Sequence, residues 1–400
     1  MFFGWHRQQF SNEIDLQRHL CSMNSPMSTN SPLAVQFAAS GNSANLDFLR
    51  SVAVLLVYVT HFHGIYTGTA VKWDFFWHIG QLGVLMFFVH TCLVLMRSLE
   101  QSNLQGAELF TTFYVRRIFR LYPLSIVCVL IAYIIDLHWE PRNLWPNLTL
   151  TQNLFFTKQP VFPPILTPLW SLPLEMEMYV ALPVLFLLLR KRPMKLLAAL
   201  WLMSLPLAII QPQLGERFEI LKFAPCFLGG IVAWCLTGQR TISRLSGWLW
   251  PFAITAVSII WMTSTERYLP LHIAGFGVCL GIAIPCFHEI PWPKVQTVSR
   301  VIARYSYGIY LSHFAIQLFC FTSPEYPHFR VIHQLPRLPH FARPVHLALC
   351  FGLSLLIPVL LYHFLESPGI RLGQRISYWL VRSKRQSNSP VLKAESGLQI

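Results

Sequence analysis

The segment from Leu46 to Gly64 reads LDFLRSVAVLLVYVTHFHG and is typical of a membrane-spanning helix. Almost every residue between Arg50 and His61 is apolar or small. Eleven steps of about 100° make about three turns, so these two side chains share one helix face and lie about 16 Å apart along the axis. Because ionisable groups are costly in hydrocarbon, we expect both to face the protein interior or a wet cavity. The plain alternative is an arginine held at the headgroups and a histidine satisfied by a neighbouring helix.

The composition indicates a protein that lies in a membrane. Of its 400 residues, 54% are hydrophobic and only 12% are charged, whereas soluble domains carry about 25% charged residues. We therefore predict an all-α, polytopic integral membrane protein with about ten spans. Gly277 and Gly281 form a GxxxG pattern in one of them, which predicts close helix packing. The spans are expected at 46–67, 76–97, 118–139, 170–190, 196–211, 218–237, 247–264, 268–288, 304–321 and 345–366.

The basic residues predict the orientation of the chain. The net charge is +14, and most of the 31 Lys and Arg residues fall on the side that carries both chain ends. Because such residues collect on cytoplasmic loops, we expect both termini in the cytoplasm and no nucleic-acid partner. Two long loops at 140–169 and 322–344 are rich in Pro and aromatic residues. They would lie outside, as binding lids or as connectors.

The chain reads as one membrane domain with two tails. Residues 1–45 are polar, with many Ser and Asn, and predict a disordered cytoplasmic tail. The membrane domain is expected over 46–368, in contact with membrane lipids, and a basic cytoplasmic tail over 369–400. The nine cysteines contain no CxxC pair, so neither a disulfide framework nor a metal site is predicted.

A cluster of arginines opens the third predicted span. The segment 113–123 reads FYVRRIFRLYP, in which Arg116 and Arg120 are four residues apart and share a helix face, with Arg117 beside them. Guanidinium groups bind phosphate oxygens through paired hydrogen bonds better than ammonium groups do. The cluster therefore predicts a phosphate site, against the alternative of a cytoplasmic anchor for the helix.

The fourth predicted span contains a carboxylate. In WSLPLEMEMYVALP, residues 170–183, Glu175 and Tyr179 lie four residues apart on one face, while Glu177 points elsewhere. A carboxylate inside a span is costly unless it is paired. We expect Glu175 to hold a protonated histidine or to orient a substrate hydroxyl, and a structural ion pair is the alternative.

The last two predicted spans carry further polar groups. In YSYGIYLSH, residues 305–313, Ser306, Tyr310 and His313 form one stripe at helical spacing. The stripe is either functional or satisfied within the core. Glu366, in the LESP that closes the tenth span, is interpreted as a structural partner of an arginine.

Taken in order, these motifs resemble the membrane-bound acyltransferase 3 family. The chain shows the R-x10-H pair, FxxRRxxRxxP, WSLxxExxxYxxxP, SxxxYLxH and a terminal ExP between residues 46 and 368. It departs from the family's LDGLRG, which is LDFLRS at 46–51, and from its FFVLSGF-like run, which is FFVHTCL at 87–93. The resemblance implies a bacterial inner-membrane enzyme that moves an acyl group, usually acetyl from acetyl-CoA, to a hydroxyl of a carbohydrate or other exported acceptor.

Depth along the spans suggests how the roles divide. An acyl-CoA donor would dock at the arginines from the cytoplasm, and the acceptor would enter from outside. His61 would take the proton of the acceptor hydroxyl, with Glu175 facing the imidazolium and Tyr179 or Tyr310 donating to the oxyanion. The predicted catalytic residues are His61, Glu175, Tyr179 and His313. The predicted donor-binding residues are Arg50, Arg116, Arg117 and Arg120.

Several alternatives stay open at this stage. No Ser or Cys in the motifs lies in a nucleophile elbow, which favours direct transfer over an acyl-enzyme, and a transient acyl-histidine also fits. A multi-pass transporter or flippase for a polar or lipid-linked solute would equally place His, Glu and Arg inside its spans. It would often show an inverted repeat, and none is detected in the sequence. A membrane scaffold would leave the buried ionisable groups unexplained.

Overall fold

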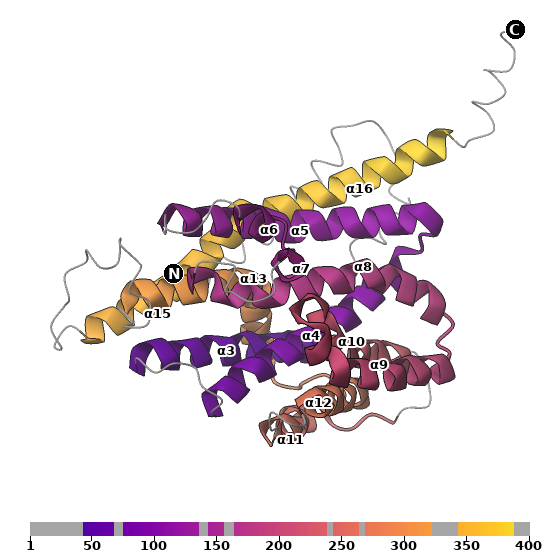
Figure 1. Ribbon diagram of the computed structural model, residues 1–400, viewed down its shortest axis with the longest axis horizontal. Coiled ribbons are helices and arrows are strands. Elements are labelled where there is room, and N and C mark those ends of the chain that lie inside the picture. The colour runs from indigo at the N-terminus through magenta and orange to yellow at the C-terminus, as the bar shows by residue number, and fades with distance from the viewer. Residues whose placement is uncertain are drawn as a thin grey trace, which may run out of the picture. The chain divides into compact units, whose positions relative to one another are not determined.

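The computed structural model is helical throughout the part of the chain that it describes (Figure 1). Between the described helices there is one isolated β-bridge, Leu245 with Phe287. The predicted all-α class is confirmed, and each of the predicted spans overlaps a helix in the described part of the chain. The structure describes residues 43–67, 75–135, 143–155, 164–237, 243–263, 269–321 and 343–387. Residues 322–342 of the predicted loop at 322–344 and most of the N-terminal tail lie outside these ranges.

The first half of the membrane domain contains four long helical segments. The 3₁₀ segment η2 runs directly into α8, so that the two form one continuous span. Two short helices, α6 and α7, come before it. The bounds in this half are α3 (Ala44–Thr67), α4 (Phe75–Ser102), α5 (Gly106–Ile135), α6 (Leu144–Leu148), α7 (Gln152–Phe155), η2 (Pro164–Trp170) and α8 (Ser171–Leu189).

The second half continues with helices of similar length. Its last three elements follow one another without a break, because a π-helical turn, η8, joins α15 to α16. The bounds are α9 (Met194–Leu214), α10 (Glu219–Thr237), α11 (Trp250–Met262), α12 (Leu269–Ala283), α13 (Pro293–Cys320), α15 (Arg343–Leu361), η8 (Tyr362–Glu366) and α16 (Ser367–Ser387).

Eight helical segments in the described part are long and apolar enough to cross a membrane, and the segment Gly247–Met262 is a shorter apolar helix. Large apolar side chains are exposed on several of them, including Leu202 and Met203 on α9 and Leu355 on α15. In a bilayer these side chains face lipid, and the helices satisfy their own backbone hydrogen bonds. The chain is therefore a polytopic membrane protein.

The core gathers around α3 and α4. Helix α3 packs against α4 and α13, and α4 packs in turn against α10. Helix α15 lies against α13, and α16 lies along α5 (Figure 1). This arrangement brings the motif-bearing helices α3, α5, α8 and α13 around α4.

Helices α10 and α12 approach each other through glycines. A Cβ added to Gly229 of α10 would collide with the backbone of Gly277, and one added to Gly281 would collide with the backbone of Gly229. Small residues of this kind let helix backbones come close together in a membrane. The packing role predicted for Gly277 and Gly281 is confirmed.

Three helix boundaries differ from the prediction by more than ten residues, and one of them is the start of α13, which lies at Pro293 rather than at residue 304. Helix α5 begins at Gly106 rather than at residue 118, so its arginines lie well inside a helix of 30 residues. The chain also stays helical past Glu366, through α16 to Ser387. Hydropathy located only the apolar half of each helix, because the polar turns before and after it carry no apolar signal.

Candidate functional site

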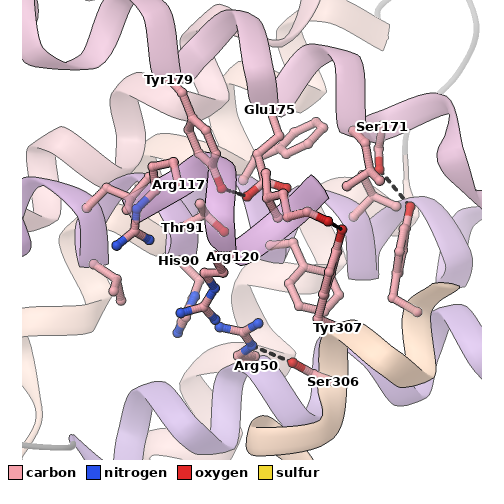
Figure 2. A pocket seen from close by; sticks show the side chains of 18 residues that line it. Arg50, His90, Thr91, Arg117, Arg120, Ser171, Glu175, Tyr179, Ser306 and Tyr307 are labelled. Atoms are coloured by element: carbon pink, nitrogen blue, oxygen red, sulfur yellow. Dashed lines mark hydrogen bonds between the residues drawn. The ribbon is translucent and has the colours of Figure 1, made fainter. Parts of the chain in front are cut away.

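A cavity lies between α3, α4, α5, α8 and α13 (Figure 2). The space open to the centre of a water molecule is about 80 Å³, which is enough for several waters. Apolar side chains such as Phe87 and Leu95 form part of the wall. We call this space the arginine cavity. Its polar lining is Arg50, His90, Thr91, Arg117, Arg120, Ser171, Glu175, Tyr179, Ser306, Tyr307 and Tyr310.

Two of the three clustered arginines line this cavity, and they are not the predicted pair. Arg117 and Arg120 line it, whereas Arg116 does not. Residues three apart also share a helix face, and α5 is rotated so that this face points inward. The structure thus brings Arg117 and Arg120 to the cavity and leaves Arg116 outside its lining. Both pairs have suitable spacing, and only the packing of α5 distinguishes them.

Arg50 reaches the cavity from α3 and is held by α13. Its Nε donates to Ser306 Oγ at 2.6 Å. Ser306, which is 1% exposed, donates its own proton to the carbonyl of Ala303 at 2.8 Å. The serine oxygen is thus an acceptor fixed toward Arg50, and the guanidinium is held inside the bundle.

Glu175 lies among the arginines of the cavity. Tyr179, one turn further along α8, donates its hydroxyl proton to Glu175 Oε1. This bond confirms the predicted shared face. Because the phenol has only one proton, Tyr179 does not point a free donor at a reacting carbonyl in this arrangement. Glu177 points elsewhere, as predicted, and accepts a hydrogen bond from Asn153.

The charges of the cavity do not balance. Arg50, Arg117 and Arg120 face it, and among the described residues that line it Glu175 is the one carboxylate. Glu366, which is 2% exposed in the π-turn η8, interacts electrostatically with Arg120 and Arg50. Its Oε2 makes no hydrogen bond with any described residue. The described lining of the cavity thus carries three guanidinium groups and one carboxylate, and a bound anion would compensate this excess of positive charge.

His61 and His313 form a hydrogen-bonded pair between α3 and α13. His313 Nε2 lies 3.0 Å from His61 Nδ1. His313 Nδ1 faces two carbonyls, of Tyr310 at 2.8 Å and of Ile309 at 3.0 Å. Since carbonyls only accept, His313 in its neutral form carries its proton on Nδ1.

This tautomer fixes the proton on His61 as well. Neutral His313 has a lone pair on Nε2, so His61 Nδ1 must donate. His61 Nδ1 also lies 3.1 Å from the carbonyl of Val57, which is another acceptor. His61 Nε2 therefore holds a lone pair, and no described residue makes a hydrogen bond to it. That atom has the form that a general base needs.

The partner of His61 is thus a histidine, and Glu175 is not in contact with it. The structure does not bring Glu175 to the imidazole, because the carboxylate lies in the cavity lining with the arginines of α3 and α5. His61 and His313 do not line the arginine cavity. Tyr310 contacts both places: it lines the cavity, and its backbone carbonyl accepts a hydrogen bond from His313.

Tyr310 is fixed on both sides of its hydroxyl. It donates to the carbonyl of Pro168 at 2.8 Å, and its oxygen lies 2.6 Å from Ser171 Oγ. Since the phenol proton is used at Pro168, Ser171 must be the donor of the second bond. Tyr310 is consequently a rigid wall of the cavity, and it would have to release Pro168 to stabilise an oxyanion.

His90 is a cavity residue that the sequence reasoning missed. It lies on α4, is 4% exposed, and its Nδ1 makes no hydrogen bond with any described residue. It occupies the fourth position of FFVHTCL, which was interpreted only as a departure from the family pattern. The default that ionisable residues inside spans are functional would have identified it.

The fold and the site together define a polytopic membrane protein with an arginine-lined cavity beside a histidine pair. The chain belongs to the acyltransferase 3 family: the family profile, described as an acyltransferase domain, matches residues 43–363. It is accordingly an acyl-transferring enzyme. This identification makes a pure transporter or scaffold unnecessary to explain the buried ionisable groups.

A curated relative supports the same class. The chain is 31% identical over 169 residues to a protein named acyltransferase MdmB from Streptomyces mycarofaciens. The match covers 38% of this chain and 41% of that protein, so it spans about two fifths of the relative's length. No solved structure matches the chain.

Proposed function

We propose that the protein is an integral membrane O-acyltransferase, which moves an acetyl group from acetyl-CoA to a hydroxyl of a carbohydrate or another cell-envelope or exported acceptor. The observation that carries this proposal is the positively charged arginine cavity together with a histidine pair built from two of the same helices, α3 and α13, in which His61 Nε2 is free to accept a proton. The donor, the acceptor and the bacterial inner membrane as location are parts of the proposal.

The charge of the cavity favours an anionic donor. Uncompensated charge inside a membrane protein is costly, and guanidinium groups bind phosphates through paired hydrogen bonds. Arg117 and Arg120, with Arg50, would hold the phosphate-bearing part of acyl-CoA. In this proposal the pantetheine arm enters the cavity and the nucleotide stays at its mouth.

The histidine pair would activate the acceptor. His61 Nε2 takes the proton of the acceptor hydroxyl as the oxygen attacks the thioester carbonyl. The C–S bond breaks, the CoA thiolate leaves, and the proton on His61 passes to that thiolate. His61 Nδ1–H stays bonded to His313 Nε2, and this bond becomes charge-assisted when imidazolium forms. General-base help of this kind contributes about 10²–10⁴-fold to rate.

The two substrates would reach the site from opposite sides. Arg50 lies near the beginning of α3, and His61 lies near its end. With both chain termini in the cytoplasm, the arginine cavity opens toward the cytoplasmic acyl-CoA pool, and His61 lies toward the acceptor outside. The acyl group would then cross the membrane interior on the donor arm.

The test uses purified protein in nanodiscs with radiolabelled acetyl-CoA and extracted cell-envelope material. We expect the label to appear on a hydroxyl of an acceptor as a base-labile ester. In cells without the gene, mass spectrometry of surface glycans and exported metabolites should show that the same ester is missing. Movement of a solute across the membrane with no ester formed in either assay would contradict the proposal and support a transporter.

A further inference from the structure

A second pocket lies at the end of the bundle where α4, α10 and α12 begin and α11 ends. Its space open to the centre of a water molecule is about 270 Å³. Four aromatic side chains line it: Trp77, Trp170, Phe223 and Trp261. We call it the aromatic pocket.

We propose that the aromatic pocket binds a neutral pyranose ring of the acceptor; this inference rests on the proposed function and names a subsite for its acceptor. A sugar ring has apolar faces of C–H groups, which pack on aromatic rings, and an equator of hydroxyls, which need hydrogen bonds. The pocket offers both kinds of contact, as ligand sites commonly do.

The aromatic walls are ordered in two pairs. The rings of Trp77 and Trp261 lie 5.9 Å apart at 31°, and those of Trp170 and Phe223 lie 5.9 Å apart at 46°. Trp261 is 1% exposed, and its Nε1 donates to the carbonyl of His78 at 2.7 Å. Tryptophans often form belts at membrane surfaces, but belt side chains face the lipid headgroups, and Trp261 and Phe223 are buried.

The polar lining suits a neutral polyol. Gln81, Glu219 and Lys222 line the pocket, and Lys222 Nζ lies 5.2 Å from the centroid of the Phe223 ring. Among the described residues of the lining, one carboxylate and one ammonium leave no net charge, in contrast to the arginine cavity. Together with the amide they provide donors and acceptors for neighbouring hydroxyls, which a lipid tail would leave unused.

The pocket adjoins the arginine cavity along α4. Gln81 lines the pocket and Val84 lines the cavity, and three residues of helix span only about 4.5 Å. The rings of Phe88, in the cavity wall, and Phe223, in the pocket wall, lie 5.4 Å apart. One aromatic layer therefore separates the two spaces.

The pocket also lies at the level of the histidine pair. Thr60, next to His61, donates to the carbonyl of Phe76 at 2.9 Å. Phe76 stacks on His63 with ring centroids 3.5 Å apart, and Trp77 follows it in the chain. A ring held in the aromatic pocket is thus at the height on α3 where His61 accepts a proton.

The experiment measures binding of phenyl β-D-glucoside, phenyl β-D-galactoside and phenyl α-D-mannoside to the full chain in nanodiscs, without acyl-CoA. We expect at least one to bind, and its Kd to rise about tenfold in Trp77→Leu and in Trp170→Leu. Trp145→Leu is the matched control, because Trp145 is an exposed tryptophan of α6 outside the pocket. Gln81→Leu keeps the aromatic walls and should also weaken binding. The proposal therefore remains testable if a tryptophan variant fails to fold.

The same variants separate the two proposals. If no pyranoside binds, if octanol competes as well as the sugars do, or if Trp145→Leu weakens binding as much as the pocket variants, the sugar site is wrong. If acyl transfer occurs but the acceptor KM is the same in every variant, the sugar site is also wrong while the transferase stands. If binding depends on the pocket but no acyl group is transferred to any acceptor, the sugar site stands and the proposed reaction is wrong.

Discussion

A single proton position decides how the histidine pair works. The carbonyls of Ile309 and Tyr310 accept from His313 Nδ1, and this leaves His313 Nε2 to accept from His61. His61 is oriented by its neighbour in the way that catalytic bases commonly are, with a neutral ring taking the place of the usual carboxylate. His313 is consequently a positioning residue, which acts through His61.

The role of His313 predicts a graded effect of substitution. His313→Phe keeps a ring but loses the acceptor, so kcat should fall by about tenfold or more, with the KM for acyl-CoA unchanged. His313→Gln offers a side-chain oxygen near the position of Nε2 and should recover part of the loss. Equal activity of the two variants, each normalised to folded protein, would show that His313 only fills space.

The arginines give a second prediction at this scale. Changing Arg117 and Arg120 together to Ala should raise the Kd for acyl-CoA about tenfold or more, because a hydrogen bond to a charged group contributes about 1.5–3 kcal/mol. The matching change of both to Lys should restore little, since paired contacts are lost. Arg116→Ala is the control and should leave the Kd unchanged, because Arg116 does not line the cavity. If the Kd for acyl-CoA is unchanged in the folded double variant, these arginines do not bind the donor and serve only to anchor the helix.

The residues show what spacing can and cannot predict. The stripe of Ser306, Tyr310 and His313 was predictable, and its members contact Arg50, Ser171 and His61 respectively. Spacing within one helix fixes a shared face. It does not fix which faces of different helices meet, and so neither the inward rotation of Arg117 nor the pairing of the two histidines could be derived.

Several helices are longer than the apolar spans that hydropathy predicts. The polar first turns of α5 and the basic helix α16 continue the apolar spans beyond their predicted ends. Between α15 and α16, the π-turn η8 places Glu366 within electrostatic range of Arg120 and Arg50. Such turns occur often at functional sites, and nothing in the sequence LESP marks one.

The contact between α10 and α12 predicts a stability effect. Gly229→Ala should lower the thermal stability and the folded yield, because the new Cβ would meet the backbone of Gly277. Gly352→Ala is the control, since a Cβ there meets no atom within 4 Å, and helix propensity favours Ala over Gly by about 1 kcal/mol. A Gly229→Ala protein as stable as the control protein would show that the two helices can separate without cost.

Across the whole molecule, orientation determines which substrate reaches which space. The excess of basic residues beside both termini predicts a cytoplasmic side for them. Trp145→Cys, on the exposed surface of α6, should react with an impermeant thiol reagent added outside intact cells. Lys191→Cys, an exposed position between α8 and α9, should react only after the membrane is opened. The reverse pattern would place the arginine cavity toward the outside and contradict docking of cytoplasmic acyl-CoA.

The central claim is that His61 activates the acceptor while the arginine cavity holds the donor. The most direct measurement compares His61→Gln with the unchanged protein, for acyl transfer and for acyl-CoA binding in the same nanodisc preparation. Gln can form hydrogen bonds but does not accept a proton near neutral pH, so transfer should fall by about 100-fold or more, with the Kd for acyl-CoA unchanged. Near-normal turnover of folded His61→Gln would show that His61 is structural and that the general-base account is wrong.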